Sequence, residues 1–220
     1  MVNISPEDNE MIKKFYDGYH SSKNLAKTYD ERADVYDEVC NKLQPLWPEH
    51  IAEELAGRYH SKELDTKLVI DMGAGTGLTG EILHDHGFRE LHALDMSSGI
   101  LEEARKKNIY KEFFTFEVSA DASPFIKDDT YDAVVSGAAI ISNHMKCDVL
   151  REFVRITKPN GFVVCTIYDP MMEMNFMEEI GSLMRKRKAE LLFMELVPYY
   201  LEYQDNYKQV NAYLLTLGVL

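Results

Sequence analysis

The stretch LVIDMGAGTG, residues 68–77, places three glycines directly after an apolar run. The run predicts a buried strand over 67–71, and the glycines predict a tight turn into a helix over 78–86. Glycine tolerates positive φ and lets the backbone approach a ligand with no Cβ in the way. Such a turn presents amides at the mouth of an open α/β sheet, where ligands bind.

The same alternation of strand and helix continues along the chain. Strands are predicted over 90–94, 113–119, 131–138 and 161–168, and helices over 98–107 and 147–157. A long helix over 172–192 and two β-rich stretches, 195–203 and 207–217, follow. This order predicts a Rossmann-like α/β fold with a parallel sheet and a C-terminal antiparallel hairpin. We expect a single domain over 1–220, with a helical cap over 1–60 and a cofactor-binding core over 61–220.

Bulk composition narrows the class of partner. The chain has 220 residues, 45% of them hydrophobic, and a formal net charge of −13. So acidic a surface repels phosphate backbones, which argues against a general nucleic-acid binder and favours a small, neutral or cationic partner. No apolar run approaches the roughly 18 residues that a membrane span needs, and the N-terminus lacks the apolar core of a signal peptide. We predict a cytoplasmic protein that binds no membrane.

The cysteines and histidines predict no metal site. The three cysteines are scattered, which fits a reduced compartment and no disulfide framework. His84 and His86 are two residues apart, and side chains at that spacing on a helix do not share a face.

Acidic residues near the glycine loop distinguish between two nucleoside cofactors. A dinucleotide fingerprint counted from Gly73 requires glycine at its sixth position, where this chain has Leu78. A second such pattern runs from Gly75 to Gly80 but begins too far past the strand. Asp71 would repel a pyrophosphate and suits a ligand with an ammonium and a sulfonium. The loop and its acids therefore favour S-adenosylmethionine as the cofactor.

Two further strand ends supply residues for the rest of that cofactor. Asp95 follows the strand over 90–94, where a carboxylate can accept both ribose hydroxyls, and Met96 can pack on the adenine. After the third strand, Asp121 can accept from the adenine amino group while Ala122 donates its amide. A helix N-terminal acid at Asp95 and a turn residue at Asp121 are the structural alternatives.

At these residues the chain resembles the class I S-adenosylmethionine-dependent methyltransferases of the UbiE-like type, which have a seven-stranded Rossmann-like fold. The resemblance covers roughly residues 29–168 and is carried by VIDMGAGTG, ALDMSSGILEEARKK and SADASPF. Residues 29–37, YDERADVYD, are similar to the motif YD-x-x-A-x-x-YD. With the NHM turn at 143–145, they look most like the Williams–Beuren syndrome region 27 methyltransferase family. That family usually has GHM, so Asn143 departs from its pattern.

The resemblance implies a role for each matching position. Asp71, Gly73 and Gly75 would hold the methionine part of the cofactor, with Ser136 near the transferable methyl, while Asp95 would bind the ribose. Tyr29 and Tyr36 would close over the site from the cap, although a packed helical face is the simpler reading of both. If the acceptor must lose a proton, His144 is the first candidate base and Tyr36 the second. The positions that would flank the adenine are Met96, Asp121 and Ala122.

The acceptor is narrowed only by what the sequence lacks. After the fourth strand comes SGAA, not the Asn/Asp-Pro-Pro-aromatic sequence of enzymes that methylate amino groups of nucleic acids, and no Pro-Cys nucleophile is present. We therefore expect a small-molecule acceptor, with a protein acceptor still open. Two other readings are a nucleotide-dependent oxidoreductase and a cofactor-binding scaffold or partner subunit without activity of its own. The sequence does not identify the acceptor or the oligomeric state.

Overall fold

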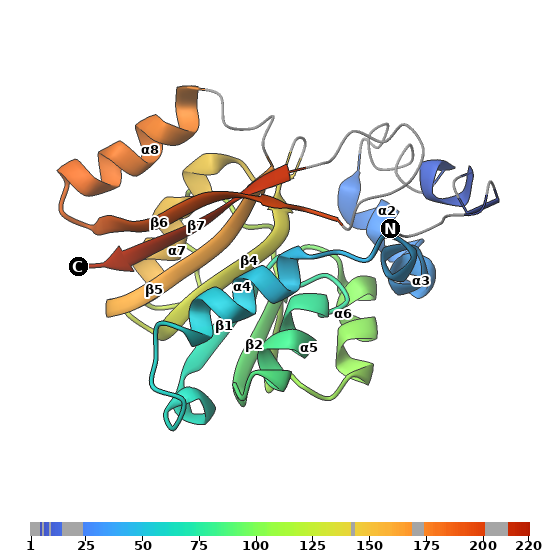
Figure 1. Cartoon of the computed structure of the whole chain (residues 1–220), viewed down its shortest axis with the longest axis horizontal. Helices are drawn as coiled ribbons and strands as arrows, with labels where there is room; N and C mark the ends of the chain where they lie inside the picture. The colour runs from blue at the N-terminus through green and yellow to red at the C-terminus, as the bar shows by residue number, and fades with distance from the viewer. Residues whose placement is uncertain are drawn as a thin grey trace.

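The computed structural model describes residues 24–141, 144–168, 174–200 and 211–220, together with residue 5 and the stretches 7–8 and 10–14. Its centre is one seven-stranded sheet in the order β3-β2-β1-β4-β5-β7-β6 (Figure 1). The neighbours from β3 to β5 are parallel, and β7 is antiparallel to both β5 and β6. The predicted Rossmann-like sheet with its terminal hairpin is therefore confirmed. The strands are β1 (Leu68–Met72), β2 (Glu90–Asp95), β3 (Glu112–Thr115), β4 (Tyr131–Ile140), β5 (Thr157–Tyr168), β6 (Ala189–Pro198) and β7 (Asn211–Val219).

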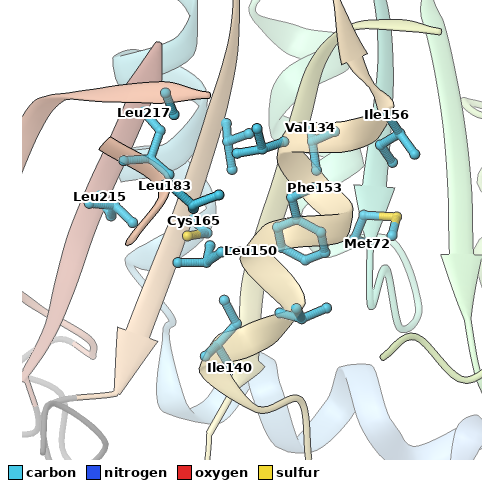
Figure 2. Packing of buried hydrophobic residues seen from close by; sticks show 14 of the residues in the cluster. Met72, Val134, Ile140, Leu150, Phe153, Ile156, Cys165, Leu183, Leu215 and Leu217 are labelled. Atoms are coloured by element: carbon cyan, nitrogen blue, oxygen red, sulfur yellow. The ribbon is translucent and has the colours of Figure 1, made fainter. Parts of the chain in front are cut away.

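Helices cover both faces of the sheet, as Figure 1 shows. On one face, α4 buries Trp47, Ile51 and Leu55 in a cluster that includes Val69 of β1. On the other face, Phe153 of α7 packs in a second cluster, which Figure 2 shows from close by. The helices are α2 (Leu25–Asp30), α3 (Ala33–Leu43), α4 (Trp47–Ala56), α5 (Leu78–Asp85), α6 (Ser98–Lys106), α7 (Leu150–Ile156) and α8 (Met174–Arg185), with short 3-10 turns at Leu64–Thr66 and Cys147–Val149.

Side chains of β1 alternate between these two clusters. Ile70 and Met72 are buried with Phe153, whereas Val69 is buried with the α4 residues. Because successive side chains of a strand point to opposite faces, Asp71 faces the same side as Val69. This orientation decides where the carboxylate of Asp71 goes.

The C-terminal part of the chain departs from the prediction. The helix predicted over 172–192 is wrong beyond Arg185, where α8 ends. Arg187 has a φ of 51°, and the Lys188 amide donates to the carbonyl of Leu183 at 3.0 Å, so the chain turns there. Strand β6 then begins at Ala189, which pairs with Val219. The middle of the predicted hairpin, 201–210, lies outside the described residues.

Three other boundaries moved. Strand β3 ends at Thr115, four residues before the predicted end at 119. Strand β5 begins at Thr157, four residues before the predicted start at 161. The helix predicted over 147–157 is a 3-10 turn followed by α7, which ends at Ile156.

Candidate functional site

A cleft opens at the carboxyl ends of β1, β2 and β4, where a parallel sheet places its ligands. The space it encloses is about 770 Å³ when its opening to solvent is included. Segments from the cap, the glycine loop and the ends of three strands form its walls. The lining residues are Tyr29, Tyr36, Trp47, 73–76, Leu78, Thr79, Asp95, Met96, 116–118, 137–139, His144 and Met145.

The glycine loop forms the floor of the cleft. Gly73 has a φ of 75° and Gly75 a φ of 57°, so both adopt the left-handed conformation that glycine tolerates. A Cβ on Gly73 would lie 2.6 Å from the Cβ of Ala139, which leaves no room for any other residue. The Gly73 amide donates to the carbonyl of Leu94 at 2.8 Å and ties the loop to the end of β2.

Asp95 joins the two loops that flank the cleft. One carboxylate oxygen accepts from the Gly75 amide at 3.0 Å, and the other accepts from the Ser97 amide at 3.0 Å. Burial raises the pKa of Asp95, and these backbone hydrogen bonds oppose the rise. The side chain still lines the cleft, so a carboxylate lies in the wall next to Met96.

Asp71 lies beneath the loop rather than in the cleft. It is not among the lining residues, and its Oδ2 accepts from the Tyr110 hydroxyl at 2.7 Å. No described residue donates to its other oxygen. Burial raises the pKa of Asp71 to about 7, and the Tyr110 hydrogen bond opposes that rise. Strand alternation turns this side chain toward Tyr110, and the predicted role of Asp71 in holding the methionine part of a cofactor stays a prediction.

Gly80 explains how Tyr110 reaches Asp71. A Cβ at this position of α5 would lie 2.0 Å from the Tyr110 hydroxyl oxygen. The glycine pattern from Gly75 to Gly80 therefore has a packing reason, and it forms no dinucleotide site.

Three more of the predicted cofactor residues lie away from the lining. Ser136 is buried, and its hydroxyl donates to the carbonyl of Met72 at 2.7 Å, which ties β4 to β1. Asp121 and Ala122 are exposed. Because β3 ends early, the chain passes the cleft at 116–118 instead, held by the Phe116 amide on the carbonyl of Asp95 at 2.9 Å. Neither Asp121 nor Ala122 is among the residues that line the cleft, so their predicted contacts with an adenine stay predictions.

Tyr29 and Tyr36, from the predicted cap, are among the residues that line the cleft. Their ring centroids are 6.1 Å apart. The Tyr29 hydroxyl lies 2.6 Å from Nε2 of His144, with the two rings edge to face. His144 sits in a turn where its own amide donates to the carbonyl of Ile141 at 3.1 Å. Asn143 of the same turn lies outside the described residues.

Two carboxylates of the cap were missed by the sequence reasoning. Asp30 accepts from the Ser97 hydroxyl at 2.6 Å and from the Gly99 amide at 2.7 Å. Asp37 accepts from the Thr76 hydroxyl of the glycine loop and pairs with Lys107 at 2.9 Å. Both acids belong to the YD-x-x-A-x-x-YD motif, in which only the tyrosines were considered.

An aromatic wall was also missed. The Trp47 ring lies 4.6 Å from that of Tyr199 and 5.5 Å from that of Tyr200, and it covers Gly137 at the end of β4. Tyr199 and Tyr200 follow β6. Because they are so distant from Trp47 in the sequence, no local sequence pattern predicts this contact.

Neither a metal cluster nor a membrane-spanning helix is found in the described part of the chain. No three His, Cys, Asp or Glu side chains there are grouped closely enough to hold a metal ion. None of the described helices is long and apolar enough to cross a membrane.

Comparison with known proteins shows which proteins this chain is similar to. Residues 70–165 match the family model described as a methyltransferase domain. Human methyltransferase-like protein 27 is 27% identical over 170 residues, 74% of this chain and 66% of that protein. A malonyl-[acyl-carrier protein] O-methyltransferase from Halorhodospira halophila is 29% identical over 149 residues, 66% of this chain and 48% of that protein. The matched part is thus less than two thirds of either relative.

Solved structures show the same fold. A SAM-dependent methyltransferase from Aquifex aeolicus has a TM-score of 0.57 at 15% identity, covering 86% of this chain and 98% of that one. The family model and the curated relative confirm the predicted class of domain, with S-adenosylmethionine as the cofactor of that class, and the solved structure confirms the Rossmann-like fold.

Proposed function

We propose that this chain, which carries a class I S-adenosylmethionine-dependent methyltransferase domain, transfers a methyl group from that cofactor to a small molecule. The observation that supports it best is the charge of the cleft. Among the described residues, the carboxylates lining it are Asp95 and Glu117, and neither Lys nor Arg lines it. Acidic walls suit a cofactor that carries an ammonium and a sulfonium, whereas a pyrophosphate would be repelled.

The residues at the cleft fit the parts of that cofactor. Asp95 would accept from the ribose hydroxyls, since each carboxylate oxygen can take more than the one hydrogen bond it already has. Met96, Phe116 and Val118 offer apolar surface beside it for the adenine. Gly73 and Gly75 leave space for the methionine part. We assign Asp71 and Ser136 to support of the loop from below.

This methyl transfer requires little covalent chemistry from the protein. When bound, S-adenosylmethionine supplies a methyl group on a sulfonium, which leaves as a neutral thioether. The chain's work is to align the acceptor with that methyl and to exclude water. Tyr29 and Tyr36 cover the cleft from the cap for the second purpose, and Asp30 and Asp37 hold the cap in place.

A small molecule is favoured as the acceptor over a nucleic acid. The net charge of −13 repels a phosphate backbone. The two relatives do not decide the acceptor, because one is named for malonyl groups on a carrier protein and the other for no acceptor.

Two variants test the assignment of the cleft. We expect Asp95→Ala to weaken S-adenosylhomocysteine binding at least about tenfold, because a hydrogen bond to a charged group contributes about 1.5–3 kcal/mol. His144→Ala should change the affinity for S-adenosylhomocysteine by less than about threefold. The binding free energies of the two variants should then differ by about 1 kcal/mol. Titration calorimetry measures both, with Asp95→Asn as a second variant that keeps the shape. A larger loss in His144→Ala than in Asp95→Ala would contradict the assignment.

A further inference from the structure

Tyr29 and His144 form the most direct polar contact across the cleft. The Tyr29 hydroxyl lies 2.6 Å from Nε2 of His144, a short distance for this kind of hydrogen bond. Their ring centroids are 5.7 Å apart at an interplanar angle of 74°. The two residues are 115 positions apart in sequence, and one comes from the cap while the other follows β4. A contact between elements so distant is made by the tertiary fold at this site.

We propose that Tyr29 and His144 are a proton relay, and that the acceptor is an uncharged molecule with a hydroxyl group that is methylated on oxygen. The inference rests on the proposed methyl transfer. With His144 neutral and protonated on Nδ1, the Tyr29 hydroxyl donates to Nε2, which leaves the Tyr29 oxygen able to accept a proton from a hydroxyl in the cleft. Tyr29 is then the residue that touches the acceptor, and His144 is the final base.

The proton and electron balance closes without another reactant. The O–H bond of the acceptor breaks, and its proton passes to the Tyr29 oxygen while the proton of Tyr29 passes to Nε2 of His144. The electron pair left on the acceptor oxygen forms the new O–C bond as the S–C bond of the sulfonium breaks. The products are the methyl ether, S-adenosylhomocysteine and a protonated His144, so one positive charge is present before and after.

The cleft selects against acceptors that carry a negative charge. An ionised carboxylate or phosphate would need a cation to hold it, and no Lys or Arg is among the described lining residues. Asp95 and Glu117 would repel such a group. An ionised group would also need no relay, and a neutral amine attacks through its lone pair before it loses a proton. Compared with an ionised group or a neutral amine, a neutral hydroxyl depends most on a base to remove its proton.

The other residues that line the cleft suit an acceptor whose hydroxyl is attached to a planar ring. Trp47, Tyr36, Leu78 and Met145 line the cleft together with the relay pair. Aromatic rings pack edge to face or offset with other rings and gain about 0.5–1.5 kcal/mol beyond the area they bury. A phenol is therefore the simplest probe of this acceptor class.

Two phenols and two variants test the relay. We would measure transfer to phenol and to 4-nitrophenol at about pH 7.5, where 4-nitrophenol is largely ionised in solution and phenol is almost wholly neutral. Tyr29→Phe and His144→Gln should each lower the rate with phenol by about 100-fold or more, the range of general base catalysis. With 4-nitrophenol each should lower it by less than about threefold, because an ionised acceptor bypasses the base. Tyr213→Phe and His60→Gln, at a half-buried and an exposed position outside the lining, are the matched controls.

A second readout needs no turnover. In the complex with S-adenosylhomocysteine, the visible absorbance of the 4-nitrophenolate anion reports the ionisation of the bound probe. We expect it to ionise at a lower pH in the unsubstituted protein than in Tyr29→Phe or His144→Gln, because the acidic walls are the same in all three and only the pair takes up its proton. Tyr36, Asp95 and Glu117 line the same cleft, and their carboxylates or hydroxyl are unchanged in both variants.

The outcomes separate the inference from the proposed function. Equal losses with both phenols would mean that the pair only holds the cap, and an unchanged ionisation of the bound probe would mean that it takes no proton; either result overturns the relay. Absence of transfer to phenol from the unsubstituted protein, while S-adenosylhomocysteine still binds, overturns the acceptor class. Failure of S-adenosylhomocysteine to bind would instead overturn the proposed function.

Discussion

Replacing Asp71 by Asn should change how the stability of the ligand-free protein depends on pH. The Asp71 carboxyl is fully buried, one oxygen accepts from the Tyr110 hydroxyl, and no described residue donates to the other. Burial raises its pKa from 3.8 to about 7. The folded protein therefore holds a proton on Asp71 at pH values where the unfolded chain has released it.

The sign and size of the effect follow from that difference. A group whose pKa is raised by folding contributes stability that is fully present below pH 3.8 and is lost as the pH rises to about 7. At about 1.36 kcal/mol per pKa unit, the free energy of unfolding should fall by about 4 kcal/mol over this range on account of Asp71. Asn does not titrate, so the variant should lack this fall. Its amide adds a donor with no partner, which shifts the stability of the variant equally at every pH.

Urea unfolding at several values between pH 4 and pH 8 measures the effect. We expect the variant to gain about 4 kcal/mol relative to the unsubstituted protein between these limits. Asp65→Asn, at an exposed position of the 3-10 turn before β1, is the matched control and should give a parallel profile. Parallel profiles for Asp71→Asn as well would refute the reasoning, because they would mean that Asp71 is ionised in the folded protein.

Three further substitutions, the first with a matched control, probe packing near the site and in the core. Gly80→Ala places a Cβ 2.0 Å from the Tyr110 oxygen and should lower the free energy of unfolding by about 1–3 kcal/mol or more. Its control, Gly181→Ala in α8, meets only the flexible end of a side chain and should be neutral or stabilising by about 0.5–1 kcal/mol. Equal effects of the two substitutions in urea unfolding would contradict this. Gly99→Ala places a Cβ 2.8 Å from the cap carboxylate that holds α6, so it should weaken S-adenosylhomocysteine binding in calorimetry, and unchanged affinity would show that cap docking is not needed. Phe153→Ala removes a fully buried ring and should cost about 3–5 kcal/mol, measured by urea unfolding, with a loss below about 1 kcal/mol as the contrary result.

The order of strands and helices was predictable because the hydrophobic pattern and the glycine loop are local signals. The boundary at Arg185 was not, because 186–192 is as compatible with a helix as with a strand in isolation. The pairing of Ala189 with Val219, which makes this segment a strand, arises only once the sheet is assembled. The early end of β3 has a similar cause, since the hydrogen bond of Phe116 to Asp95 depends on a strand distant in sequence.

The site was predicted in part for the same reason. Gly73, Gly75, Asp95 and Met96 follow strand ends directly, so their place at the sheet edge can be read from the sequence. The location of Asp71 depends on which face of β1 it occupies and on Tyr110 reaching it across Gly80. The aromatic wall and the cap carboxylates depend on how α4 and the cap pack, which no local pattern encodes.

Thermal unfolding with S-adenosylhomocysteine and with a nicotinamide dinucleotide tests the central claim most directly. The claim is that the glycine loop and the acidic cleft bind the cofactor of methyltransferases. S-adenosylhomocysteine at a hundredfold excess over its dissociation constant should stabilise the protein by about 2.7 kcal/mol, and the dinucleotide should leave the midpoint of unfolding unchanged. No shift with millimolar S-adenosylhomocysteine, or a shift with the dinucleotide alone, would contradict the account.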